Sequence, residues 1–472
     1  MLPTLTLLAQ LSWSPLRPVQ PEAQALHEGE VEGGEGDAAP VEVPVEPKDE
    51  AGTWRHLLRA DATAGWTSNA RQIASEDGKS VFVNPAIQAG LQLTGSAAQQ
   101  RAGGGSVQVA ASALVLQNFA LDGAVPANEG SGALRVQYTH PFTARSQGIF
   151  AVGGTIGTLA ARRATDPRMA AIDPTSVNRT YASTALETAW LHALTATTRI
   201  GTGLSTTALF TVDDQDQSLA GDQSLRHRGL DQLLVNAEFG VEHDLTLRLR
   251  AEGLVRLLHA EQPFVLDLST GTPRNVGPFR TDAATVLAGA AYDITEHFQA
   301  DARAGASVSR ALPDDPDQTP NLDPAALVRA SYDDERRRVS MAASYQYAAA
   351  VPRLGAGPTA GLLLSAYGLP YDQGGWRQLN LLAMAAVDQS DSRTTASSSL
   401  RVRNASATAA LRWSIDRRFG VIGGVDVRAS RFAGTGLVPA DFDRTLVFVG
   451  ISYVETNARD ERTLIPFGDL PL

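Results

Sequence analysis

The sequence predicts an all-β fold, a transmembrane antiparallel up-and-down β-barrel of about 18 strands. Three observations lead to this prediction. From Thr53 onward, apolar and polar residues alternate with a period of two, whereas the helical period is almost absent. Short turns alternate along the chain with longer polar loops. No uninterrupted apolar run is long enough for a membrane-spanning helix, so a membrane crossing has to be made by strands.

The N-terminal part differs from the rest in composition. Residues 1–25 combine a short apolar run with the small residues Ala23 and Ala25, which is typical of a signal peptide and its cleavage site. Residues 26–52 are acidic and rich in Gly and Pro, and such a segment buries too little apolar surface to order itself. We expect a disordered periplasmic tether, which serves either as a docking segment for a partner or as a solvated spacer.

The barrel is expected to span residues 53–454. In the segment 245–258, Leu245 and Leu247 share one face while Arg248 and Arg250 share the other. The same alternation defines the other segments. The expected strands are 54–67, 81–95, 106–120, 132–142, 148–161, 179–192, 198–212, 230–242, 245–258, 281–292, 298–310, 325–332, 338–348, 359–369, 376–388, 398–415, 419–431 and 444–454.

The connections between these segments follow two patterns. Short turns are expected near residues 97–104, 143–147, 195–197, 243–244, 295–297, 333–336, 371–374 and 416–418. Longer loops rich in Asp, Pro and Gly lie between them. Two of these loops, Glu261–Arg280 and Leu312–Asp323, are long enough to fold inward and narrow a pore.

A closed barrel accounts for this pattern better than a soluble fold. A bilayer leaves no water to satisfy a sheet edge, so a membrane-spanning sheet closes on itself. A soluble β-sandwich built from so many strands and no helical domain would be unusually large. A soluble repeat protein, such as a propeller or a solenoid, is the alternative.

The lumen-facing side chains are expected on the polar face of each strand, because a charge is costly on the lipid face. Nine of the fourteen candidates are arginines, and arginine rings favour anions. Two interpretations remain: the arginines line a path for an anionic or heavily hydroxylated solute, or they pair with carboxylates and brace the wall. The candidate pore-lining residues are Arg135, Glu238, Glu242, Arg248, Arg250, Glu252, Arg256, Asp301, Arg303, Arg329, Arg401, Arg403, Asp426 and Arg428.

Several functions are disfavoured by the sequence. There is no cysteine, and the net charge of −11 argues against nucleic acid as the main partner. Metal-binding and phosphate-binding motifs are absent, so no cofactor is expected. The nearest candidate for catalysis is His259 with Glu261 at a strand end, and a loop histidine beside a glutamate is more often incidental. The chain is therefore expected not to be an enzyme.

The segment 444–454 resembles the closing strand of outer-membrane barrels, in which a glycine precedes an aromatic residue by three positions, here Gly450 and Tyr453. In that pattern the strand ends the chain and is recognised by the barrel assembly machinery. Here residues 455–472 follow it as an expected C-terminal periplasmic tail, so this recognition departs from the simple pattern.

Three features are similar to the 18-stranded porins that work with polysaccharide-export proteins in myxobacteria: the strand count, the acidic tether, and cations that are almost all arginine, with only Lys48 and Lys79 as lysines. The resemblance implies an outer-membrane conduit that exports a secreted polysaccharide with a periplasmic export partner. Two alternatives remain: a general solute-diffusion or uptake porin, and a non-conducting barrel that anchors an assembly.

Overall fold

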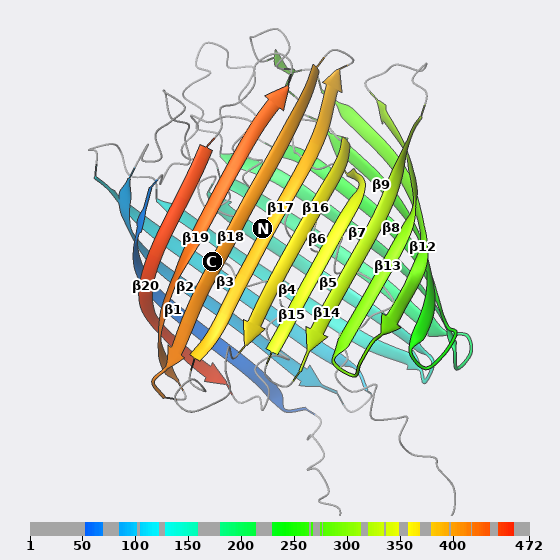
Figure 1. The fold of residues 1–472 in the computed structure, drawn as a ribbon, viewed down its shortest axis with the longest axis horizontal. Coiled ribbons are helices and arrows are strands. Elements are labelled where there is room, and N and C mark those ends of the chain that lie inside the picture. The colour runs from blue at the N-terminus through cyan, green and yellow to red at the C-terminus, as the bar shows by residue number, and fades with distance from the viewer. Residues whose placement is uncertain are drawn as a thin grey trace, which may run out of the picture.

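The chain folds into one large barrel of slanted strands in a computed structural model (Figure 1). The structure describes residues 52–68, 85–101, 104–121, 128–158, 180–213, 229–263, 266–267, 274–275, 277–312, 320–334, 337–348, 357–368, 379–395, 398–416, 418–434 and 442–456. The expected signal peptide, nearly all of the tether and nearly all of the tail lie outside these ranges. Within them, no helix is long and apolar enough to cross a membrane.

Eighteen strands form the wall, and two short ones form a separate hairpin. The wall strands are β1 (Trp54–Thr67), β2 (Ala86–Gln100), β3 (Ser106–Ala120), β4 (Glu129–Thr143), β5 (Ser146–Thr158), β6 (Thr180–Ala193), β7 (Thr198–Asp213), β8 (Gly229–Asp244), β9 (Leu249–Gln262), β12 (Phe279–Asp293), β13 (Phe298–Leu312), β14 (Asn321–Asp333), β15 (Arg337–Ala348), β16 (Gly357–Gly368), β17 (Leu379–Thr395), β18 (Ser398–Ser414), β19 (Phe419–Gly434) and β20 (Phe442–Thr456). The hairpin consists of β10 (Leu266–Asp267) and β11 (Arg274–Asn275).

The sheet is closed and antiparallel throughout. Each wall strand pairs with the next along the chain, and β9 pairs with β12 past the small hairpin. The ring closes where β1 pairs with both β2 and β20, so that Ala62 lies opposite Leu91 on one side and Ile451 on the other. All-β architecture, closure and a count of 18 confirm the expected fold class.

All 18 expected strands are present, and three of them are displaced toward the C-terminus. β2 begins at Ala86, β9 at Leu249 and β17 at Leu379, each later than expected. The turn expected at 243–244 was wrong: residues 245–248 form it instead. The hydroxyl of Thr246 accepts hydrogen bonds from the backbone N–H groups of Arg248 and Leu249. These side-chain contacts replace the interstrand backbone hydrogen bonds, so the strand reverses here.

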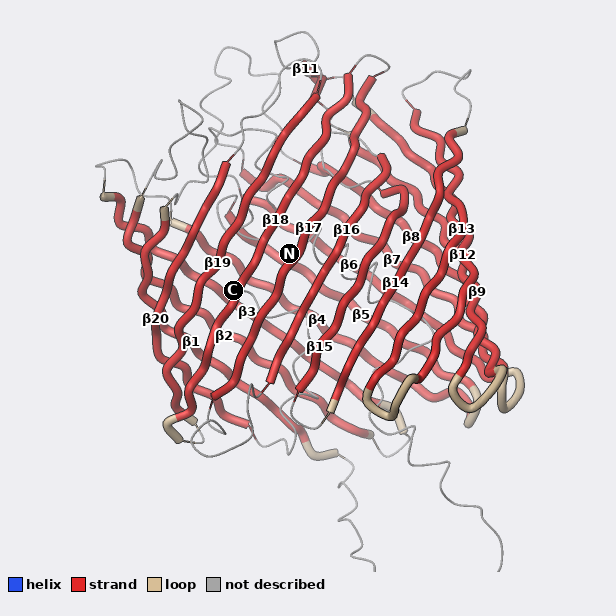
Figure 2. The backbone as a smooth tube through the Cα atoms, viewed as in Figure 1, coloured by secondary structure: helices blue, strands red, loops and turns tan. Residues whose placement is uncertain are grey.

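The same device recurs in three other tight turns. Thr195 accepts from Thr197 and Thr198, Thr295 from His297 and Phe298, and the Asp416 carboxylate from Arg418 and Phe419. In each case Leu or Ile precedes the acceptor residue. These turns gather at the lower end of the barrel (Figure 2). A Leu or Ile followed by Thr or Asp, whose side chain accepts hydrogen bonds from the residues two and three positions later, therefore sets where strands reverse at this end.

The outer face carries an apolar belt with defined edges. On β12, β18 and β20, an outward aromatic residue (Tyr292, Trp413, Tyr453) lies ten positions from the first outward charged one (Asp282, Arg403, Asp443). The outward positions between them are apolar on β12 and β18, and on β20 all but one are apolar. Ten residues rise about 34 Å along a strand, or about 26 Å across the membrane at a usual barrel tilt. That height matches the apolar band of membrane barrels, which is about 25 Å.

Candidate functional site

The inner wall of the barrel is the candidate functional surface. On each strand the residues that alternate with the exposed apolar ones face the interior. Eleven of the fourteen candidate residues lie on this inner face: Arg135, Glu238, Glu242, Arg250, Glu252, Arg256, Asp301, Arg303, Arg329, Asp426 and Arg428.

Three candidates lie elsewhere. Arg248 is in the exposed β8–β9 turn, because β9 begins one residue later. Arg401 and Arg403 point to the outer face, where they contact Asp391 and Gln389 of β17. They were assigned inward because a charge is costly in lipid. These two residues lie at or above the edge of the apolar belt, where that cost is absent.

A cluster of charged side chains covers the inner face of β7, β8, β9 and β13. We call it the ion-pair cluster, and its members are Arg199, Glu238, Glu242, Asp244, Arg250, Glu252, Arg256, Asp301 and Arg303. Five carboxylates thus meet four guanidinium groups. Most members are nearly fully buried against the wall and one another.

The cluster resolves a like-charge conflict that the sheet register creates. Glu242 and Glu252 lie directly opposite each other on β8 and β9, an arrangement that is repulsive on its own. Glu242 receives Arg250 at 3.5 Å and Arg199 at 3.6 Å, whereas Glu252 receives Arg303 at 2.6 Å. Each carboxylate is neutralised from a different side.

Arg303 reaches Glu252 across an intervening strand. Glu252 of β9 lies opposite Gly289 of β12, which in turn lies opposite Arg303 of β13. A Cβ atom at Gly289 would lie 1.9 Å from the Ala302 carbonyl oxygen and 2.6 Å from the Arg303 Cα. The glycine allows the close approach of β12 and β13 and leaves a path for the guanidinium group.

Arginine–carboxylate pairs occur on the inner wall both within the ion-pair cluster and beyond it. Arg256 contacts Glu238 at 2.5 Å, Arg428 contacts Asp426 at 2.8 Å, and Arg135 contacts Glu187 at 2.7 Å. Hydroxyl and amide groups lie among them, as in the contact between Gln88 and Asn118 and that between Thr285 and Ser307. The geometry is that of arginines that brace the wall, the second of the two interpretations drawn from the sequence.

Several inner-wall charges were missed from the sequence. Arg59, Asp61 and Arg199 occupy inner positions, and Asp61 and Glu187 are partners of arginines. On β1, Arg59 and Asp61 alternate with Leu58, which points outward and is 44 % exposed. This alternation was the sequence signal that could have placed both charges on the inner face. A small apolar cluster was also missed on the inner wall, formed by Leu254, Leu287, Ala325 and Leu327.

The β10–β11 hairpin lies in the connection between β9 and β12, within the loop Glu261–Arg280 that was long enough to fold inward. β10 lies against β17, which is five strands away from β12 around the ring. Figure 2 places β11 near the upper strand ends on the side of β17 to β19. The hairpin therefore lies at the upper mouth of the barrel, beside β17.

His259 and Glu261 do not contact each other. His259 lies 2.7 Å from Asp282, and Glu261 pairs with Arg280 at 3.3 Å, both on the outer face. The hydroxyl of the nearby Ser309 is on the inner face of β13. It therefore lies on the opposite side of the sheet from His259 and cannot form a hydrogen bond with it.

Comparison with known proteins gives fold-level likenesses only. No protein-family model matches the chain, and no curated protein matches it. Among solved structures, the FrpB iron transporter of Neisseria meningitidis aligns over 85% of this chain and 81% of its own, at 9% identity and a TM-score of 0.42. The ferric yersiniabactin uptake receptor FyuA of Yersinia pestis aligns over 86% of this chain and 80% of its own, at 10% identity and a TM-score of 0.41. OccAB3 of Acinetobacter baumannii aligns over 85% of this chain and 99% of its own, at 10% identity and a TM-score of 0.38.

Proposed function

We propose that this protein is an outer-membrane conduit for a heavily hydroxylated solute, most specifically a secreted polysaccharide delivered by a periplasmic export partner. The membrane placement is supported by the closed sheet and by the apolar belt with aromatic and charged edges. A barrel of 18 strands is wide enough to enclose an aqueous channel.

The observation that carries the choice of solute is the pairing on the inner wall. A ring of free arginines would favour small anions. Here Arg199, Arg250, Arg256 and Arg303 are held by carboxylates, and Ser, Thr, Asn and Gln side chains share the wall with them. Such a surface offers hydrogen bonds in both senses with little net charge, which suits the hydroxyl groups of a sugar chain.

Two measurements test this proposal together. In proteoliposomes, we expect neutral oligosaccharides to permeate and the rate to fall with their length. In the native bacterium, deletion of the gene is expected to abolish surface polysaccharide while its precursors accumulate in the periplasm. Unchanged surface polysaccharide together with sugar permeation would instead identify a general diffusion porin. A folded barrel that passes neither ions nor sugars would identify a structural anchor.

A further inference from the structure

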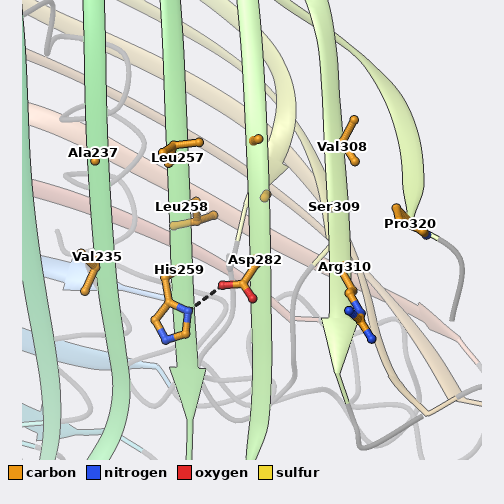
Figure 3. Close-up of a pocket in the computed structure, with 12 residues that line it drawn as sticks. Val235, Ala237, Leu257, Leu258, His259, Asp282, Val308, Ser309, Arg310 and Pro320 are labelled. Atoms are coloured by element: carbon orange, nitrogen blue, oxygen red, sulfur yellow. Dashed lines mark hydrogen bonds and ion pairs between the residues drawn. The ribbon is translucent and has the colours of Figure 1, made fainter. Parts of the chain in front are cut away.

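A row of three polar side chains crosses the outer face at the upper edge of the apolar belt. His259 of β9, Asp282 of β12 and Arg310 of β13 lie directly opposite one another in the sheet register. All three alternate with buried inner residues, so they point away from the lumen (Figure 3). This row faces the level at which lipid headgroups lie in a bilayer.

A recess of about 410 Å³ lies beside this row on the belt side. Its apolar lining includes Val235, Ala237, Leu257, Ala284 and Val308, from four adjacent strands. Ala237 and Ala284 are short, whereas Leu257 and Val308 project beside them, so the hollow follows from side-chain size. The surface thus offers a hydrocarbon groove directly below a polar row.

Two opposite charges in the row remain open to a ligand. The Asp282 side chain is 59% exposed, and the His259 ring contacts only one of its two oxygens, at 2.7 Å. Arg310 is exposed and forms no ion pair within the described part of the chain. The next row upward is self-contained, because Arg280 pairs with Glu261.

We infer that this site binds one phospholipid whose headgroup combines a phosphate with a primary ammonium group, as phosphoethanolamine does. An acyl chain fills the recess, the phosphate contacts Arg310 and the ammonium group donates to Asp282. Cross-strand neighbours on one face lie about 5 Å apart, a separation that matches the two charges of such a headgroup. A purely anionic headgroup would be repelled by Asp282, and a trimethylammonium group has no N–H to donate.

The test measures lipid binding by the full-length chain after exchange into lipid-free detergent. Native mass spectrometry gives the affinity of the first bound lipid for dioleoyl phosphatidylethanolamine, phosphatidylglycerol and phosphatidylcholine. We expect phosphatidylethanolamine to bind about tenfold more tightly than the other two. Arg310→Gln weakens its binding about tenfold, whereas Asp282→Asn weakens phosphatidylethanolamine and strengthens phosphatidylglycerol.

Matched variants separate the site from the rest of the surface. Ala284→Phe fills the recess and is expected to abolish the preference, while Ala288→Phe, two outward positions lower on β12, leaves it unchanged. Arg431→Gln removes another outer arginine, which lies at the edge of the belt on β19, away from the recess, and also leaves the preference unchanged. Folding of each variant is checked by circular dichroism.

Three results would overturn the inference. The first is equal affinity for the three lipids. The second is a change in the same direction for phosphatidylethanolamine and phosphatidylglycerol when Asp282→Asn is introduced. The third is competition by free phosphoethanolamine with the same affinity as the whole lipid. The inference needs the membrane placement but not the conduit. Loss of sugar permeation would leave lipid binding intact, so the two proposals fail separately.

Discussion

Arg303 is buried on the inner wall because its charge is matched there. Its side chain is 5% exposed, and those of Glu252 and Asp301 are 2% and 4% exposed. A buried pair contributes little net stability compared with apolar residues of similar size, but removal of one partner leaves an uncompensated charge. We expect Arg303→Met to lower the free energy of unfolding by about 3 kcal/mol and Arg303→Met with Glu252→Met to recover most of it. Urea unfolding in detergent measures both, and equal midpoints for the wild type and Arg303→Met would contradict the pairing.

Asp416 makes one tight turn sensitive to pH. Its carboxylate accepts hydrogen bonds from the backbone N–H groups of Phe419 and Arg418, each at 2.7 Å, and these hold the Asp416 pKa below its ordinary value of 3.8. A lowered pKa contributes stability above the ordinary value, and this stability is lost as the pH falls through the folded-state pKa. The stability difference between the wild type and Asp416→Ala should therefore be present at neutral pH and shrink in acid.

Thr246 provides the matched control for this pH dependence. Its hydroxyl makes the same two backbone contacts in the β8–β9 turn but does not titrate. We expect Thr246→Val to destabilise the barrel by about 1 kcal/mol at every pH. A pH-independent effect of Asp416→Ala would show that the carboxylate charge is not what stabilises its turn.

At the scale of strands, the close approach of β12 and β13 depends on glycine. A Cβ at Gly289 has no room, whereas a Cβ at Gly132 on β4 would meet its nearest atom at 3.8 Å. We expect Gly289→Ala to destabilise the barrel by about 1–3 kcal/mol and Gly132→Ala to be neutral or slightly stabilising. Thermal unfolding followed by the loss of β-sheet circular dichroism compares them. Equal effects would show that β12 can move without cost.

For the molecule as a whole, paired arginines predict weak ion selectivity. A barrel reconstituted in a planar bilayer should show a cation-to-anion permeability ratio near one, because the ion-pair cluster leaves little net charge. Glu252→Gln should shift the ratio toward anions, since it releases Arg303 from a partner. Strong anion preference in the wild type would restore the interpretation of free arginines along the path.

The fold was predictable from the sequence because the period of two is imposed on every strand by the two faces of the wall. Arg135, Asp301 and Asp426 were placed inward correctly by parity alone. The assignment of charged residues to the inner face failed for Arg401 and Arg403. The strands continue above the belt, and there a charged side chain can point outward without contacting the hydrocarbon core of the bilayer. It also could not give the partners of Arg303, which depend on the stagger between three strands and on the absence of a side chain at Gly289.

The apolar belt also makes the barrel a gauge of bilayer thickness. A belt of about 26 Å is shorter than the hydrocarbon core of an average bilayer, about 30 Å, and suits a thin membrane. The mismatch predicts faster and more complete refolding into vesicles of short-chain lipids than into those with long chains. Moving the upper edge with Asp282→Leu and Arg403→Leu should shift that optimum toward longer chains. The ten-residue interval between aromatic and charged rows would then act as a sorting signal, which directs the chain to one membrane by its thickness.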